Sequence, residues 1–162
     1  MTLATRLIES GLAVATAESL TAGLLSAELT DRPGASAFFL GGINCYQDEV
    51  KIHELDVDPQ LITERTAVDG EVAIQLAAHV RDKFSKACSK HVEQVLGVST
   101  TGIAGPDSVG EVPVGTVFLG ISSVRGSRFI ALKLDGNRSQ IRAATVTEAL
   151  AAIQDEIQAI FG

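Results

Sequence analysis

The sequence predicts an α/β protein, a three-layer α/β/α sandwich built around a mixed sheet. Three observations favour this class: short apolar runs alternate with amphipathic segments, two strand-like runs follow each other near the end, and a long amphipathic segment closes the chain. The 162 residues suffice for one domain with one sizeable core, and we expect residues 1–162 to form it.

The first half of the chain alternates between helical and strand-like patterns. Leu3, Leu7 and Ile8 fall on one helical face, and Gly11 is a typical helix stop. The run after Gly11 is apolar and partly β-branched, as in a buried strand. The predicted elements are a helix over 2–11, a strand over 12–17, a helix from Leu24 to the Pro-Gly turn at 31–34, a strand over 37–45 and a short helix over 48–54.

The second half contains the longest periodic segments. A helix within 66–86 has regularly spaced apolar residues, and the closing segment repeats this spacing from Ile141 to Ile160. Between them lie three β-rich runs, the last two close enough for an antiparallel hairpin. The predicted elements are a helix within 66–86, a strand over 95–99, strands over 116–124 and 129–134 joined by a turn at 125–127, and a helix over 137–161.

Composition narrows the function classes. A net charge of −7, with no block of like charges, argues against non-specific nucleic-acid binding. No segment has the roughly 20 apolar residues that span a bilayer, so no membrane partner is expected. Cys45 and Cys88 lack metal-ligand spacing, which is typical of free thiols in a cytoplasmic protein. The three histidines show no clustered partners, so no metal site is predicted. The apolar stripes allow a homodimer without requiring one.

Three polar or glycine-rich segments each follow a strand-like run, namely 17–23, 46–51 and 100–107. Because ligands in such sheets bind beyond the carboxyl ends of strands, we expect these segments to meet at one site. The first supplies Ser19 and the second Lys51, whereas the third is a turn that can expose backbone amides to an anion. A serine with a nearby base can attack an amide, so the sequence predicts an amidohydrolase acting on a small anionic metabolite.

Each of these residues also has an ordinary structural interpretation. Ser19 or Thr21 is a good helix N-cap, and Lys51 acts as a base only if burial or neighbouring cations favour its neutral amine. Tyr46 can pack rather than donate to a substrate. The 101–106 loop can be a simple connection, and Arg142, which could clamp a phosphate with its planar guanidinium, can equally be solvated. The residues alone leave these alternatives open.

Taken together, these segments resemble a known family. The resemblance lies in Ala17–Gly23, Asp31–Ser36, Gly41-Gly42, Tyr46–Lys51, Thr101–Pro106, Pro113–Val117, Gly136–Arg138 and Arg142, in this order along nearly the whole chain. The family is the C-terminal domain of the competence/damage-inducible protein CinA, whose stand-alone members are nicotinamide mononucleotide (NMN) amidohydrolases. The set of motifs is specific, although each motif alone is weak.

The resemblance implies hydrolysis of NMN to nicotinate mononucleotide and ammonia, without a metal or an organic cofactor. It makes Ser19 the nucleophile, Lys51 its base and Tyr46 a supporting hydrogen-bonding residue. The turn of Thr21, Ala22 and Gly23 would offer amides to the oxyanion. The rest of the nucleotide would be held by Ser36, Gly42, Thr101, Gly102, Gly105 and Arg142.

The sequence departs from the family pattern at four places. Thr-Gly-Gly is replaced by Thr21-Ala22-Gly23, and the residues between Tyr46 and Lys51 differ. Val-Ser-Glu becomes Val68-Asp69-Gly70, and Asp-Gly-Gly becomes Asp107-Ser108-Val109. These changes motivate a second hypothesis, a nucleotide-binding module of the same fold with weak or no catalysis. A regulatory partner protein is a third, which nothing in the composition favours.

Overall fold

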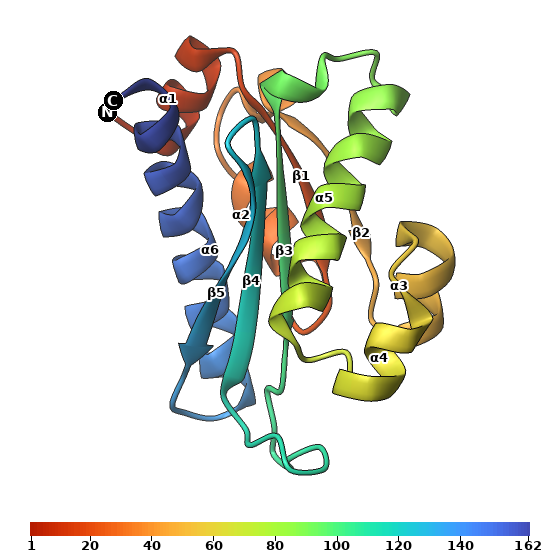
Figure 1. The fold of residues 1–162 in the computed structure, drawn as a ribbon. Helices are drawn as coiled ribbons and strands as arrows, with labels where there is room; N and C mark the ends of the chain where they lie inside the picture. Colours follow the sequence, from red (N-terminus) through yellow and green to blue (C-terminus); the bar gives the residue numbers. More distant parts are fainter.

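A computed structural model describes all 162 residues. Five strands form one sheet in the order β2-β1-β3-β4-β5, with β1 (Ala13–Glu18) parallel to β2 (Phe39–Asn44) and β3 (Val95–Gly102). Strand β4 (Thr116–Ser123) runs antiparallel to β3 and to β5 (Gly126–Lys133). The sheet is therefore mixed, as predicted, and its last two strands form the predicted hairpin (Figure 1).

Helices α1 (Leu3–Ser10), α2 (Leu24–Thr30) and α6 (Arg138–Phe161) cover one face of the sheet. Asn137 caps α6, and its side chain and that of Gln140 form a reciprocal capping box that fixes where this helix begins. The larger core lies on this face, because alternate residues of the central strands point toward these helices. Its members include Leu7, Val14, Leu25, Leu29, Leu96, Val98, Leu119, Ile121, Ile141 and Ile153.

Helices α3 (Asp48–Leu55), α4 (Pro59–Arg65) and α5 (Gly70–Ala87) lie on the opposite face (Figure 1). Ala15 and Ala17 point to this side and pack in a second core with Leu76 and Val80 of α5. Two short 3-10 helices, at Ala35–Ala37 and Val92–Gln94, precede β2 and β3. The three-layer arrangement that the sequence predicts is thus confirmed.

The long helix α5 lies where the sequence predicts a helix within 66–86, apart from its last residue. Three details differ from the sequence predictions. Helix α4 was not predicted, although Asp58 followed by Pro59 is a typical helix start and the Asp58 side chain accepts from the Gln60 N–H. Strand β3 continues three residues beyond Ser99 because β4 pairs with it there, and the hairpin turn is Val124-Arg125, with Gly126 and Ser127 already in β5.

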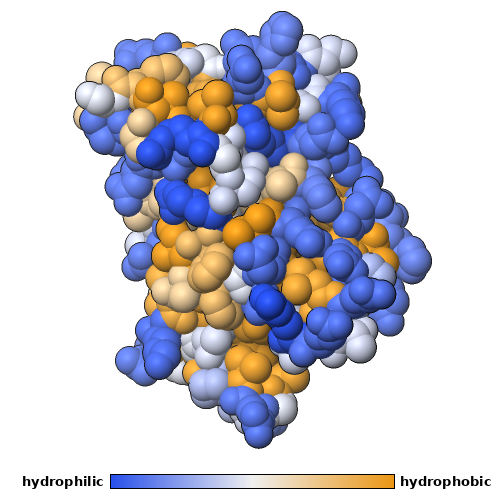
Figure 2. Space-filling view, viewed as in Figure 1, coloured by the Kyte–Doolittle hydropathy of each residue, from blue (hydrophilic) through white to orange (hydrophobic).

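Part of the α5 face remains open over the hairpin. Phe129 of β5 stacks edge-to-face on Phe118 of β4, yet about 45% of Phe129 stays exposed. Figure 2 shows apolar residues gathered beside α5 on this face. None of the helices is both long and apolar enough to cross a lipid bilayer.

Candidate active site

A cavity of about 400 Å³ lies where the carboxyl ends of β1 and β3 meet the segments around α3 and α4. Such volumes are typical of small-ligand sites. The three segments that the sequence predicts to form the site, 17–23, 46–51 and 100–107, all contribute residues to this cavity. Other parts of the chain, which the sequence did not indicate, also line it. The lining residues are Ser19, Leu20, Tyr46, Asp48, Lys51, Ile62, Thr66, Ala67, Val68, Thr101, Gly102, Ile103, Ala104, Val109, Val112 and Arg138.

Ser19 follows directly after β1 and is held by its backbone rather than by its side chain. Its N–H donates to the Thr100 carbonyl at 3.0 Å and lies 3.3 Å from the Thr100 hydroxyl. That hydroxyl also bonds the Thr21 hydroxyl at 2.8 Å, so Thr21 is buried and anchors the turn to β3. The Ser19 hydroxyl makes no hydrogen bond in the protein, and 8% of the residue is exposed. It is therefore free to meet a ligand.

The start of α2 is satisfied by Glu18, not by Ser19 or Thr21. The buried Glu18 carboxylate accepts from the N–H groups of Gly23, Leu25 and Ser26 and from the Ser26 hydroxyl, at 2.6–3.0 Å. The N-cap position is Gly23, in a left-handed conformation with φ of 96° and no capping side chain of its own. The Gly23 amide, predicted to face an oxyanion, is thus already occupied by Glu18.

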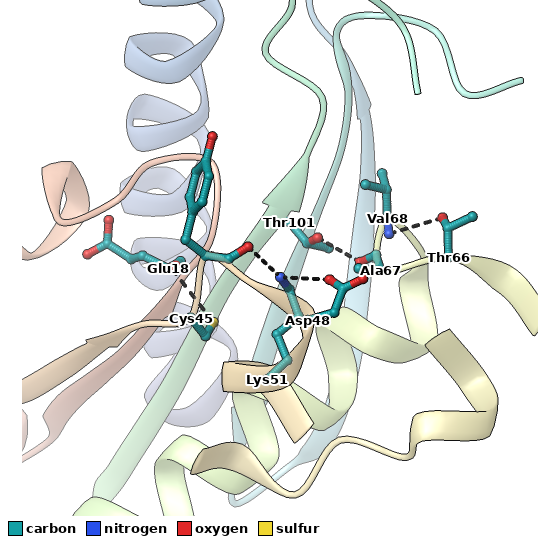
Figure 3. Close-up of polar contacts among 9 residues, drawn as sticks. Glu18, Cys45, Asp48, Lys51, Thr66, Ala67, Val68 and Thr101 are labelled. Atoms are coloured by element: carbon teal, nitrogen blue, oxygen red, sulfur yellow. Dashed lines mark hydrogen bonds and ion pairs between the residues drawn. The ribbon is translucent and has the colours of Figure 1, made fainter. Parts of the chain in front are cut away.

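Lys51 is almost completely buried, with 1% exposed, on α3. Its Nζ donates to the Tyr46 carbonyl at 3.1 Å and lies 3.4 Å from Oδ1 of the half-exposed Asp48 (Figure 3). No hydrogen bond joins Nζ to the Ser19 hydroxyl, although both residues line the same cavity. An ammonium has three donors, so at least one can be directed to a ligand.

Tyr46 and Arg138, which both line the cavity, contact each other. The Tyr46 side chain is half-exposed, and its hydroxyl accepts from Nη2 of Arg138 at 3.1 Å. Arg138, in the first turn of α6, also donates to the Gly105 carbonyl at 2.7 Å. Arg138 thus joins three segments far apart in sequence. Apart from Lys51, it is the only cation among the lining residues.

The segment after Thr100, which the sequence suggests is a loop, begins as part of strand β3 and forms one wall of the cavity. Thr101 and Gly102 still belong to β3 and line the cavity. The Thr101 hydroxyl donates to the Ala67 carbonyl at 2.7 Å, which fixes the α4–α5 connection against the strand (Figure 3). A side chain at Gly102 would meet Val117 and the Thr116 carbonyl within about 3 Å. Gly105 has φ of 89° and does not line the cavity, but its carbonyl holds Arg138.

Arg142 does not line the cavity, in contrast to its predicted role as a clamp for the nucleotide. Its Nε donates to the Leu20 carbonyl at 2.9 Å and its Nη2 to the Thr21 carbonyl at 3.1 Å. The guanidinium is therefore used by the turn that follows Ser19. The spacing of four residues along α6 places Arg138 and Arg142 on the same side of the helix, one turn apart, so the sequence pattern could not tell which of the two reaches the cavity.

Ser36 and Gly42 also lie outside the cavity. Ser36 is exposed in the 3-10 helix before β2, next to a Gly34 that approaches Ile8 of α1, at the amino end of the strands. Gly42 lies within β2, where a Cβ would overlap the Thr16 hydroxyl and approach that of Ser26. Because Gly42 has no side chain, the Thr16 and Ser26 hydroxyls can form their hydrogen bond at 2.8 Å. The structure thus places these two predicted substrate contacts outside the cavity.

The departures from the family pattern are accommodated locally. Ala22 is exposed and adopts φ of 46°, which strains a residue with a Cβ. Asp69 caps α5 by accepting from the Glu71 N–H at 2.8 Å. Gly70 leaves room for the ring of Phe129, which a Cβ would meet at 2.7 Å. Two departures contribute side chains to the cavity wall, Val109, where a glycine is usual, and Asp48, between Tyr46 and Lys51.

Cys45 is buried near the charges of Glu18 and Lys51. Burial raises the pKa of its thiol to about 11, against an opposing effect of the nearby Lys51. Its Sγ is 3.6 Å from the Glu18 carbonyl. Both cysteines are free, and no group of three or more His, Cys, Asp or Glu side chains could hold a metal ion.

Sequence reasoning missed several residues that shape the site. Glu18 carries the one clear signal, a charge ending the apolar run of β1. Asp48, Val68, Val109 and Arg138 line the cavity because the tertiary fold brings four separate connections together, and no short-range pattern indicates that.

Comparisons with known proteins show which family the chain is similar to. Residues 1–157 match the family described as the CinA C-terminal domain. A CinA-like protein of Frankia casuarinae is 40% identical over 144 residues, covering 89% of this chain and 31% of that protein. The chain spans about a third of the length of the curated relatives that it matches.

Solved structures show the same fold. The competence/damage inducible protein CihA from Agrobacterium tumefaciens is 33% identical, with a TM-score of 0.82 over 94% of this chain and 92% of that one. A CinA superfamily protein from Enterobacter cloacae is 27% identical, with a TM-score of 0.85 over 96% of this chain and 88% of that one.

Proposed function

The chain belongs to the CinA C-terminal domain family, and we propose that it hydrolyses the carboxamide of NMN, releasing nicotinate mononucleotide and ammonia. One observation carries the proposal: an unbonded serine hydroxyl and a buried lysine amine share a single cavity at the carboxyl ends of the parallel strands. A serine beside an amine base is a known solution for cleaving amides without a metal. The names of the relatives state only that they are CinA-like or competence-damage inducible.

In the proposed reaction the Ser19 oxygen attacks the carboxamide carbon while its proton passes to Nζ of Lys51. The tetrahedral intermediate then collapses, and Lys51 returns the proton to the leaving nitrogen so that ammonia departs. A water molecule attacks the resulting ester of Ser19, which releases the carboxylic acid and restores the serine. The balance is one NMN and one water consumed for one nicotinate mononucleotide and one ammonia.

The walls of the cavity suit the two ends of such a nucleotide. Ile62, Val68, Ile103, Val109 and Val112 provide an apolar surface for an aromatic ring. The Arg138 guanidinium uses only some of its five N–H donors on Gly105 and Tyr46, which leaves others for a phosphate at the mouth. We propose that Arg138, rather than Arg142, binds the substrate phosphate, and that Tyr46 orients it.

The test is ammonia release from NMN by the purified chain. We expect Ser19→Ala to lower kcat at least about a hundredfold. We expect Arg138→Met to raise KM for NMN about tenfold or more, since a phosphate contact is lost, and to change KM little for nicotinamide riboside, which has no phosphate. Turnover that Ser19→Ala leaves unchanged would remove the proposal.

A second candidate function is NMN binding without efficient hydrolysis. The observation that favours it is the Lys51 amine, which is engaged by the Tyr46 carbonyl and Asp48 instead of the Ser19 hydroxyl. Calorimetric binding of NMN without any product over hours would support this alternative, whereas measurable ammonia from the wild type, absent in Ser19→Ala, would reject it.

We further propose a cytoplasmic setting and a small nucleotide, not nucleic acid or a membrane, as the partner. Two free cysteines and a net charge of −7 support this proposal. A homo-oligomer stays a prediction from the sequence.

A further inference from the structure

The turn after Ser19 uses its carbonyl groups in a defined way. Ala22 donates its N–H to the Ser19 carbonyl at 3.2 Å, and Arg142 binds the next two carbonyls, those of Leu20 and Thr21. Three successive peptide groups are therefore fixed, two of them by one guanidinium from α6.

The N–H groups of the same turn divide into two kinds. Those of Ser19, Ala22 and Gly23 donate to Thr100, Ser19 and Glu18 respectively. Those of Leu20 and Thr21 have no acceptor in the protein, although both residues are at least 97% buried. Buried backbone N–H groups are nearly always paired with protein, water or a ligand, so these two neighbouring groups, which have no protein acceptor, are available to a ligand atom beside the nucleophile.

Arg142 determines where one of these N–H groups points. In a trans peptide the carbonyl and the following N–H point in opposite directions. The Leu20 carbonyl is directed to Arg142, so the Thr21 N–H points away from α6. The Ser19 carbonyl is directed into the turn, so the Leu20 N–H points out of it, and Leu20 itself lines the cavity.

We propose that the N–H groups of Leu20 and Thr21 bind the oxyanion formed on attack by Ser19, and that Arg142 is the positioning residue that orients them. This inference rests on the proposed function and deepens it, because it assigns Arg142 to the transition state rather than to the phosphate. It also replaces the amides of Ala22 and Gly23, which are occupied within the turn. Loss of one oxyanion donor typically lowers kcat by 10²–10³.

The first experiment separates kcat from KM with two matched variants of α6. We expect Arg142→Met to lower kcat for NMN about tenfold to a hundredfold and to leave KM within about twofold. Arg138→Met should instead raise KM for NMN and change kcat little. In the Ser19→Ala background, adding Arg142→Met should leave the Kd for NMN unchanged, and Arg142→Lys, which keeps one donor, should recover part of kcat. An Arg142→Met variant with raised KM and unchanged kcat would overturn the proposal.

The second experiment does not depend on NMN or on the folding of a variant. A small fluorophosphonate reacts with an activated serine, and its phosphoryl oxygen then occupies the oxyanion position. In the ¹⁵N-labelled wild type, the amide protons of Leu20 and Thr21 should move downfield on labelling, whereas that of Gly23 should not.

The outcomes distinguish the two proposals. Labelling with both amides shifted, but without NMN turnover, would remove the proposed substrate and keep the oxyanion assignment. Labelling without a shift at either amide, or an unlabelled Ser19, would overturn that assignment even if NMN is hydrolysed.

Discussion

Glu18, next to the nucleophile in sequence, and Lys51, which shares its cavity, are buried charged residues that differ in how well the protein satisfies them. The Glu18 carboxylate accepts four hydrogen bonds from the start of α2 and has no access to the cavity. The Lys51 amine has one carbonyl and one long contact to a half-exposed carboxylate, and it lines the cavity. The satisfied charge holds the turn in place, and the less satisfied one is available for chemistry.

The largest expected effect is on stability at Glu18. Replacing Glu18 by Ala leaves the buried Leu25 N–H, the part-buried N–H groups of Gly23 and Ser26, and the Ser26 hydroxyl without this acceptor. We expect a loss of about 3–5 kcal/mol in the free energy of unfolding, measured by urea denaturation. Glu18→Gln, which keeps one oxygen, should lose less. A loss below about 1 kcal/mol for Glu18→Ala would show that the comparison with Lys51 is wrong.

Lys51 should respond in the opposite way. Lys51→Met keeps the length of the side chain and removes the amine, so we expect kcat for NMN to fall at least about a hundredfold, or about 2.7 kcal/mol in the barrier. The free energy of unfolding should change by less than about 1 kcal/mol, because a poorly compensated buried charge is removed. Both measurements use the same preparation. Retained activity with a large loss of stability would make Lys51 a structural residue.

Cys45, whose thiol is affected by both of these charges, should make the protein sensitive to alkali. Its pKa is about 11 in the folded protein and near 9.0 when unfolded, so the folded state holds the proton more tightly. This stabilisation is complete below pH 9 and is lost as the pH rises toward 11, amounting to about 2–3 kcal/mol. Urea denaturation from pH 8 to 11 measures it. Cys45→Ala should flatten this dependence, whereas Cys88→Ala, at an exposed site, should leave it unchanged.

The smallest expected effect concerns the strained turn itself. Ala22→Gly removes a Cβ from a left-handed conformation and should raise the free energy of unfolding by about 0.5–1 kcal/mol. Ala143→Gly, at an exposed position within α6, is the matched control and should lower it by about 1 kcal/mol. Equal effects of the two changes would mean that the turn carries no strain.

The fold was largely predictable because its signals are local. Apolar periodicity indicates α1, α5 and α6, and the two neighbouring β-rich runs indicate the hairpin. The end of β3 was not predictable, since Thr101 and Gly102 stay in the sheet through pairing with β4 alone. Asp58-Pro59 is the local signal in the sequence for the start of helix α4.

The site was predictable only in outline. Ser19 and Lys51 come from segments that end strands, and the topology brings both to one cavity. The roles of Arg138 and Arg142 depend on which turn of α6 reaches the cavity. The role of Glu18 depends on its hydrogen bonds to the start of α2. Ser36 and Gly42 match the family motifs, yet tertiary packing assigns them elsewhere.

The most direct test of the account is the mass of the intact protein after its reaction with NMN is stopped by acid. We predict a covalent adduct with the mass of NMN less one ammonia, located on the peptide that contains Ser19, formed by the wild type and absent from Ser19→Ala. Full turnover without such an adduct, and at an equal rate in Ser19→Ala, would contradict the assignment of Ser19 as the nucleophile.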